Sequence, residues 1–184
     1  FQLQKRYVLS PIRSGFILID QQAAHERILF EQYIKSMAHN SKASQRQLFP
    51  VTIEYSEADT ALFEEIISDI QSLGFDVQPF GQNTFVVHGT PVESINQDEQ
   101  ALIEMMLESY KASYGNDAIS KVERLAQSMA KGVTNIPYKK LDVREMKMII
   151  EDLFACEEPN YTVNGKKTFV TISLNEIDQK FINN

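Results

Sequence analysis

The spacing of apolar residues changes at residue 20, and this change predicts a strand that leads directly into a helix. Residues 16–19 form a continuous apolar run after Gly15, which is typical of a buried strand. Asp20 then lies at the start of a helix, where its carboxylate accepts hydrogen bonds from free backbone N–H groups. The helix is predicted to run to about residue 38, and its apolar positions are Leu29, Phe30, Tyr33, Ile34 and Met37.

The rest of the chain alternates between strand-like and helix-like segments. The apolar pattern predicts strands at 7–12, 48–55, 75–80, 84–88 and 168–172, and helices at 57–73, 97–113, 118–130, 142–154 and 174–181. Gly115 and Asn116 are expected to break the chain between two of these helices. Because the strands are arranged in hairpins rather than in a regular strand–helix–strand series, the sequence predicts an α+β fold with mixed or antiparallel sheets packed against helices.

Composition narrows the function classes. The chain has 184 residues, a net charge of −7 and 43% hydrophobic residues, so it can bury a core but is a poor candidate for independent binding to duplex DNA. No apolar run approaches the ~20 residues of a membrane-spanning helix. The single cysteine, Cys156, excludes an internal disulfide and is expected to be a small buried apolar residue in a cytoplasmic protein. The chain begins without a methionine, and we expect it to be part of a longer protein.

Three polar side chains meet at the predicted strand-to-helix corner. Asp20 ends the strand, and Gln22 and Glu26 are four residues apart on one side of the first helical turns. One interpretation is structural: Asp20 caps the helix and the other two lie on a solvated face. The other interpretation is a metal or catalytic site, because clustered carboxylates bind cations.

The segment from Asp20 to Glu31, Asp-Gln-Gln-Ala-Ala-His-Glu-Arg-Ile-Leu-Phe-Glu, resembles the signature of the C-terminal domain of MutL DNA mismatch-repair proteins. In endonuclease members this signature begins Asp-Gln-His-Ala, whereas Gln22 replaces the histidine here. The resemblance covers essentially the whole chain. It implies a discontinuous dimerisation subdomain, residues 1–50 with 136–184, and an outer, regulatory subdomain, residues 51–135.

The other metal-binding motifs of endonuclease members are also altered. By register, their first cysteine falls at Lys131, and the cysteine and histidine of their late motif fall at Thr162 and Asn164. Transition metals favour thiolate and imidazole ligands, and a nearby lysine ammonium opposes a cation. Only Asp20 and Glu26 remain as strong ligands, and two carboxylates without further ligands seldom hold a transition metal. We therefore predict no metal, no cofactor and no DNA nicking.

The alternative is a residual metal-dependent nicking endonuclease that uses Asp20 and Glu26, with His25 in place of the missing imidazole. His25 precedes Glu26 directly, and its side chain therefore points about 100° away around the helix.

A short motif suggests a second partner. Gln45, Leu48, Phe49 and Pro50 match the pattern of the short peptide that binds bacterial replication sliding clamps. The alternative is that Leu48 and Phe49 are core residues that open a strand. The resemblance also makes a mismatch-recognition protein a candidate partner.

Self-association is the third partner prediction. The candidate interface residues are apolar and more numerous than one small subdomain readily buries: Phe16, Leu18, Leu29, Tyr33, Phe169, Val170 and Ile172. An ordinary intramolecular core is equally compatible with the pattern. The resemblance favours a homodimer that holds two N-terminal ATPase domains together, with DNA bound through the full-length protein. Lys139-Lys140 and Lys166-Lys167 leave a local basic spot in an otherwise acidic chain.

Overall fold

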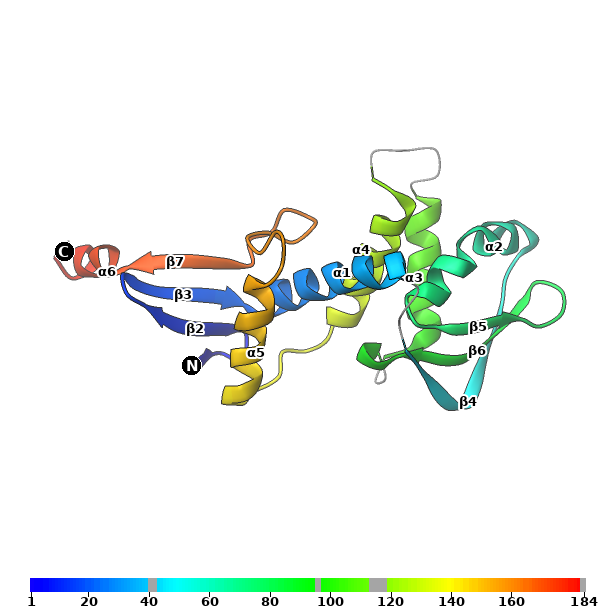
Figure 1. Ribbon diagram of the computed structural model, residues 1–184, viewed down its shortest axis with the longest axis horizontal. Coiled ribbons are helices and arrows are strands. Elements are labelled where there is room, and N and C mark those ends of the chain that lie inside the picture. Colours follow the sequence, from blue (N-terminus) through cyan, green and yellow to red (C-terminus); the bar gives the residue numbers. More distant parts are fainter. Residues whose placement is uncertain (40–42, 95–96, 113–118, 183–184) are drawn as a thin grey trace. The chain divides into compact units, whose positions relative to one another are not determined.

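The computed structural model describes residues 1–39, 43–94, 97–112 and 119–182 (Figure 1). The chain forms two compact units, residues 1–31 with 134–184 (unit 1) and residues 32–133 (unit 2). The sequence prediction placed the boundaries after residues 50 and 135, but strand β4 (Ser44–Glu54) pairs inside unit 2, so the first boundary lies earlier. Which unit serves dimerisation stays a prediction.

Unit 1 is built on an antiparallel sheet of order β1-β2-β3-β7. Its strands are β1 (Gln2–Leu3), β2 (Tyr7–Ile12), β3 (Gly15–Asp20) and β7 (Phe169–Ser173), and the expected hairpin joins β2 to β3. Gly15 has a φ of +155°, and a Cβ at this position would collide with the carbonyl oxygen of Ile172 on β7. Glycine is therefore required where β3 approaches β7.

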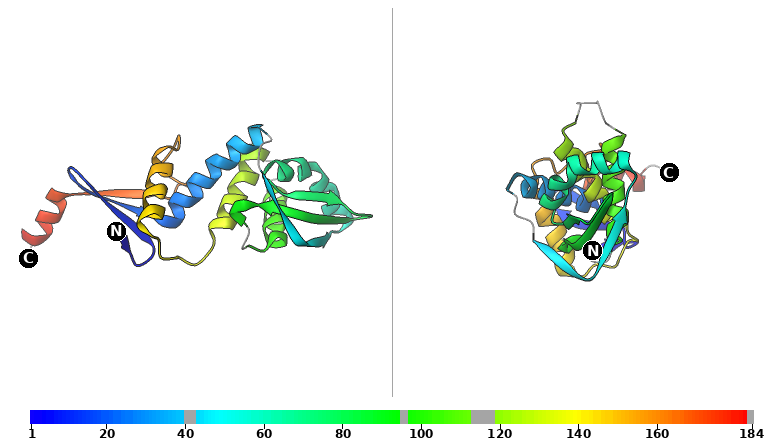
Figure 2. Two further views of the ribbon diagram at one scale, coloured as in Figure 1. Left: turned by 60° about the horizontal axis from the view of Figure 1, so that its bottom comes forward. Right: turned by 90° about the vertical axis from the view of Figure 1, so that its right-hand side faces the viewer.

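Helices cover one face of this sheet. Helix α5 (Val143–Phe154) lies across it, and helix α1 (Gln21–His39) starts directly after β3, an inner strand of the sheet (Figure 2). The buried cluster between the sheet and these helices consists of Val8, Ile17, Ile19, Ala24, Ile28, Leu141 and Leu153. Asp142 caps α5 in a capping box, because its side chain accepts from Glu145 N while the Glu145 side chain accepts from Asp142 N. Helix α6 (Leu174–Ile182) follows β7 and has no buried residue.

Unit 2 contains a second antiparallel sheet of order β4-β6-β5, with β5 at Asp76–Pro79 and β6 at Thr84–Pro91. Its remaining elements are α2 (Glu57–Ser72), the short 3-10 helix η1 (Val92–Ser94), α3 (Glu99–Lys111) and α4 (Lys121–Thr134). Its fully buried core includes Phe63, Phe85, Ile66, Ile103, Met106 and Leu125. The α+β prediction is confirmed. The predicted break at Gly115-Asn116 lies outside the described residues.

Among the described residues, no helix is long and apolar enough to cross a membrane.

Candidate functional site

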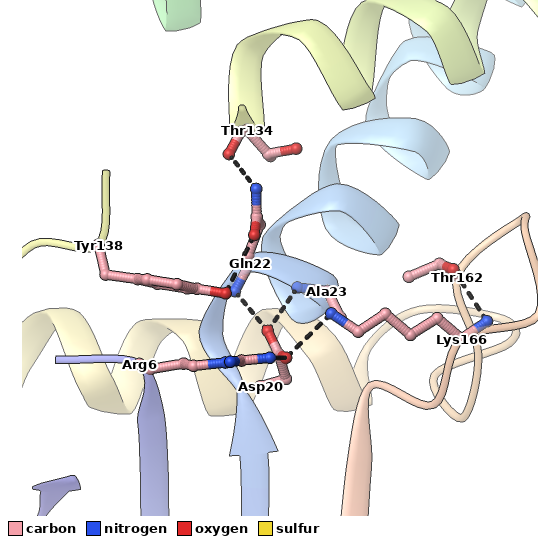
Figure 3. A network of polar contacts seen from close by, with 8 residues as sticks. All are labelled: Arg6, Asp20, Gln22, Ala23, Thr134, Tyr138, Thr162 and Lys166. Carbon is pink, nitrogen blue, oxygen red and sulfur yellow. Dashed lines mark hydrogen bonds and ion pairs between the residues drawn. The ribbon is translucent and has the colours of Figure 1, made fainter. Parts of the chain in front are cut away.

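Asp20 caps helix α1, as the sequence predicts. Its Oδ1 accepts hydrogen bonds from the backbone N–H groups of Gln22 and Ala23, both at 3.1 Å (Figure 3). The residue is 7% exposed, so this carboxylate lies largely out of solvent at the corner between β3 and α1. One of its two oxygens is thus fully used by the helix.

The other carboxylate oxygen of Asp20 faces two cations. Lys166 Nζ lies 3.0 Å from Oδ2, and Arg6 Nη2 lies 3.5 Å from it (Figure 3). Burial alone would raise the pKa of Asp20, but the hydrogen bonds from Lys166 and Ala23 and the charges of Lys166 and Arg6 hold that pKa below its ordinary value. Asp20 is therefore a paired carboxylate, and its second oxygen is already in contact with the Lys166 ammonium.

Gln22 is also fully engaged. Its amide nitrogen donates to the carbonyl oxygen of Thr134 at 2.9 Å, and its amide oxygen accepts from the Tyr138 hydroxyl at 3.1 Å (Figure 3). The residue that stands in the histidine position of endonuclease members thus links α1 to the segment after α4.

Lys166 is presented by a tight turn between α5 and β7. Thr162 N donates to Lys166 O at 2.8 Å, Lys166 N donates to the Thr162 hydroxyl at 3.2 Å, and Gly165 has a φ of +77°. Asn164 lies exposed in this turn, and Thr162 is 3% exposed. Thr162 stands where endonuclease members are expected to have a cysteine, and its hydroxyl stabilises the turn that carries Lys166.

Two buried charges of α1 anchor the same loop, and the sequence prediction missed both. Arg27 Nε donates to Tyr161 O at 2.6 Å, and Glu31 accepts from the backbone N–H groups of Glu157 at 2.8 Å and Glu158 at 3.2 Å. Arg27 and Glu31 are 5% and 8% exposed and pair with each other at 3.6 Å. Their spacing of four residues on an otherwise apolar helix face was the available signal.

The residues at this corner do not fit a transition metal. Asp20 and Gln22 spend their donor atoms within the chain, and the Lys166 ammonium adds a positive charge beside them. His25 is exposed on α1, and Lys131 lies on α4 in unit 2. In the part of the chain that the structure describes, no three His, Cys, Asp or Glu side chains are grouped so as to hold a metal ion.

Of the predicted clamp-binding residues, Leu48, Phe49 and Pro50 lie on a bulge in strand β4, whereas Gln45 pairs with Thr90 on β6. Ser44–Arg46 pair with Gly89–Pro91 and Val51–Glu54 pair with Thr84–Val87, so residues 47–50 stand opposite His88 alone. Leu48 is 92% exposed and Phe49 is 85% exposed. Both side chains therefore lie in solvent rather than in the core of unit 2.

The strand register of unit 1 separates the predicted interface residues by face. Leu18 stands between Leu9 and Val170, and Phe16 stands between Pro11 and Ile172, so these side chains share the face opposite the helices. Val170 is 40% exposed, and Phe16, Leu18 and Ile172 are half-buried. We call this surface the apolar sheet face; it consists of Leu9, Pro11, Phe16, Leu18, Val170 and Ile172.

The other interface candidates lie elsewhere. Phe169 packs against the buried cluster on the helix side of the sheet, with its ring 5.2 Å from that of Phe154. Leu29 and Tyr33 on α1 are 2% and 0% exposed. Their part in a dimer stays a prediction.

The chain is a two-unit α+β domain in which the carboxylate at the β3–α1 corner is paired with side chains of the same chain. The sequence model of the family described as the MutL C terminal dimerisation domain matches residues 1–134, and the chain belongs to this family. It is 32% identical over 181 residues to a DNA mismatch repair protein MutL of Flavobacterium psychrophilum, and 33% identical over 181 residues to one of Flavobacterium johnsoniae. A MutL of Pelodictyon phaeoclathratiforme is 32% identical over 181 residues. Each match covers 98% of this chain but only 28–30% of the relative's length.

Proposed function

We propose that this chain is the homodimerisation and partner-recruiting domain of a mismatch-repair protein and that it has no nicking activity of its own. In the full-length protein it would hold two N-terminal ATPase domains in one molecule, so that they meet at a high effective concentration. DNA would be bound through the full-length protein, and a mismatch-recognition protein would be one of its partners.

The apolar sheet face is the observation that carries the dimerisation proposal. Six apolar side chains occupy adjacent rows of a sheet whose other face is already covered by helices. Exposed apolar patches of this kind mark interaction surfaces, and obligate homodimer interfaces are mainly apolar. A twofold axis would place this face against the same face of a second copy.

Light scattering on the purified chain tests this proposal. We expect twice the monomer mass of 21.1 kDa at micromolar concentration. Replacing Leu18 and Val170 together by Glu would place unpaired charges in the interface and weaken the dimer by at least about 100-fold. Thr171→Glu is the matched control, because Thr171 is exposed on the same strand but alternates to the other face. A monomeric wild type, or a dimer that tolerates both charges, would refute the proposal.

The occupied Asp20 carboxylate supports the absence of nicking. A metal ion would have to displace both Lys166 and Arg6 and would then find the Gln22 amide already bonded. We expect supercoiled plasmid to stay intact with manganese. Nicking that disappears in Asp20→Asn and Glu26→Gln would instead establish the residual endonuclease.

The β4 bulge supports recruitment of a sliding clamp. Leu48 and Phe49 are two adjacent large apolar side chains that are almost fully exposed, as a peptide that fills an apolar pocket requires. Replacing Gln45, Leu48 and Phe49 by Ala should abolish capture by an immobilised clamp. The matched control replaces Ser44, Arg46 and Thr52 on the same strand, and equal capture by both variants would contradict the proposal.

A further inference from the structure

Helix α6 has a well-defined start but no buried residue. Glu176 N donates to Ser173 Oγ at 3.2 Å, and Ser173 N donates to Glu176 Oε2 at 2.6 Å, so a capping box fixes the first turn. After this start, none of the nine residues of the helix is buried. In Figure 1 the helix follows the end of β7 and extends beyond the sheet of unit 1.

The apolar residues of α6 lie on one side of the helix. Leu174, Ile177 and Phe181 are spaced i, i+3 and i+7, and we call the row that they form the α6 stripe. Leu174 is 55% exposed, Phe181 is 85% exposed, and Ile177 is half-buried. Helix α6 is therefore amphipathic, and its apolar side lies largely in solvent.

The α6 stripe continues the apolar sheet face. Leu174 N donates to Ser14 O at 2.9 Å, directly after the last pair between β7 and β3, so the register of that pairing extends to Leu174. Every second side chain along a strand points to the same face, and Leu174 therefore follows Val170 and Ile172. One apolar surface thus continues from the sheet onto the helix.

A helix as short as α6 is marginal unless it packs against something. Isolated helices of fewer than about 12–15 residues are only partly formed in water, and most helical stability in proteins comes from packing of an apolar side. The capping box supplies a start for α6, but the α6 stripe is the surface through which the helix can be stabilised.

We propose that α6 is an arm that packs the α6 stripe on a second copy of this chain and completes its folding there. The inference rests on the proposed homodimer and adds to it a contact outside the sheet and a folding step that is coupled to assembly. A second copy is the partner that the surface favours, because the stripe continues the face that the dimer would bury and a twofold axis pairs like surfaces. Burial of the stripe would offset the conformational entropy lost when the arm becomes ordered.

Sedimentation equilibrium on the intact chain measures what the stripe contributes to the dimer. Ile177→Glu with Phe181→Glu places two charges on the stripe and keeps helix propensity high, because glutamate favours helices. We expect the dimer to weaken at least about tenfold. The matched control, Asn175→Glu with Gln179→Glu, adds the same two charges at exposed positions on the other side of α6 and should dimerise as the wild type does.

Amide hydrogen exchange on the wild type tests the coupled folding. At concentrations well above the dimer dissociation constant, we expect the amides of α6 to be protected. Well below that constant, α6 should lose its protection while β3 and α5, which contribute to the buried cluster of unit 1, keep theirs.

The outcomes separate this inference from the proposed function. Equal dimerisation by the stripe variant and its control, or protection of α6 that is unchanged on dissociation, would overturn the arm and leave the dimer standing. A wild type that remains monomeric at micromolar concentration would overturn both.

Discussion

Asp20 combines two stabilising roles that two substitutions can separate. Asp20→Ala removes both the cap of α1 and the partner of Lys166 and Arg6, whereas Asp20→Asn keeps an oxygen that can accept from the two backbone N–H groups and loses only the charge. A lost N-cap costs about 1 kcal/mol. The Lys166 and Arg6 side chains are 51% and 42% exposed, so solvent screens each pair to at most about 1 kcal/mol.

From these values we expect Asp20→Asn to cost about 1 kcal/mol of unfolding free energy and Asp20→Ala about 2–3 kcal/mol. Urea unfolding followed by circular dichroism, at one fixed protein concentration, measures both. Asp142→Asn is the matched control, because Asp142 caps α5 and has no ion pair among the described residues, so its charge should matter little.

The pH dependence of this difference has a definite sign. The folded-state pKa of Asp20 is lowered, chiefly by Lys166 and Ala23 acting against burial. Its charge therefore stabilises the fold fully above the unfolded pKa of about 3.9, and this contribution is lost as the pH falls through the folded pKa. The difference in stability between the wild type and Asp20→Asn should therefore begin to shrink near pH 4 and close only below the folded pKa of Asp20. Equal costs for Asn and Ala, or a gap that widens in acid, would refute the reasoning.

Further substitutions test the supports of the corner. Arg27→Met leaves buried Glu31 without its cation and should cost about 3–5 kcal/mol, measured by urea unfolding, whereas exchanging both residues for apolar ones should cost less. Gly15→Ala should cost more than about 2 kcal/mol and loosen β7, which amide hydrogen exchange would detect as lost protection, because the added Cβ meets the β7 backbone. Burial raises the pKa of both Tyr33 and Tyr55, so in an ultraviolet titration these two phenols should ionise only when alkali unfolds the chain. If the chain dimerises, its melting temperature should rise with protein concentration, and a constant value would contradict the dimer.

Local sequence signals were sufficient for most of unit 1. The apolar run before Asp20, the helical spacing after it and the helix that starts near residue 142 each depend on residues within one or two turns of each other, and the structure reproduces all three. The turn at Gly165 is also a local feature, because its positive φ is a conformation that glycine adopts readily.

Long-range contacts could not be predicted in the same way. The bond from Arg27 to Tyr161 and the pair between Asp20 and Lys166 join residues 134 and 146 positions apart. The face on which Phe169 lies depends on the register of β7 against β3, and a shift of one residue would exchange it with Val170. The exposure of Leu48 and Phe49 likewise depends on a register shift in β4 that residue spacing does not encode.

The contacts of Asp20 explain how the fold keeps a carboxylate that is largely buried. An isolated buried carboxylate is unfavourable, so Asp20 needs a compensating cation. Lys166 supplies that cation from within the chain. Because Arg27 and Glu31 bind the base of its loop to α1, the ammonium is held near Asp20 without any ligand from solution. We therefore expect chelators to leave the unfolding free energy of the chain unchanged. The ion pairs of Asp20 connect β3, α1 and the loop before β7, in the same unit as the apolar sheet face that the proposed dimer requires.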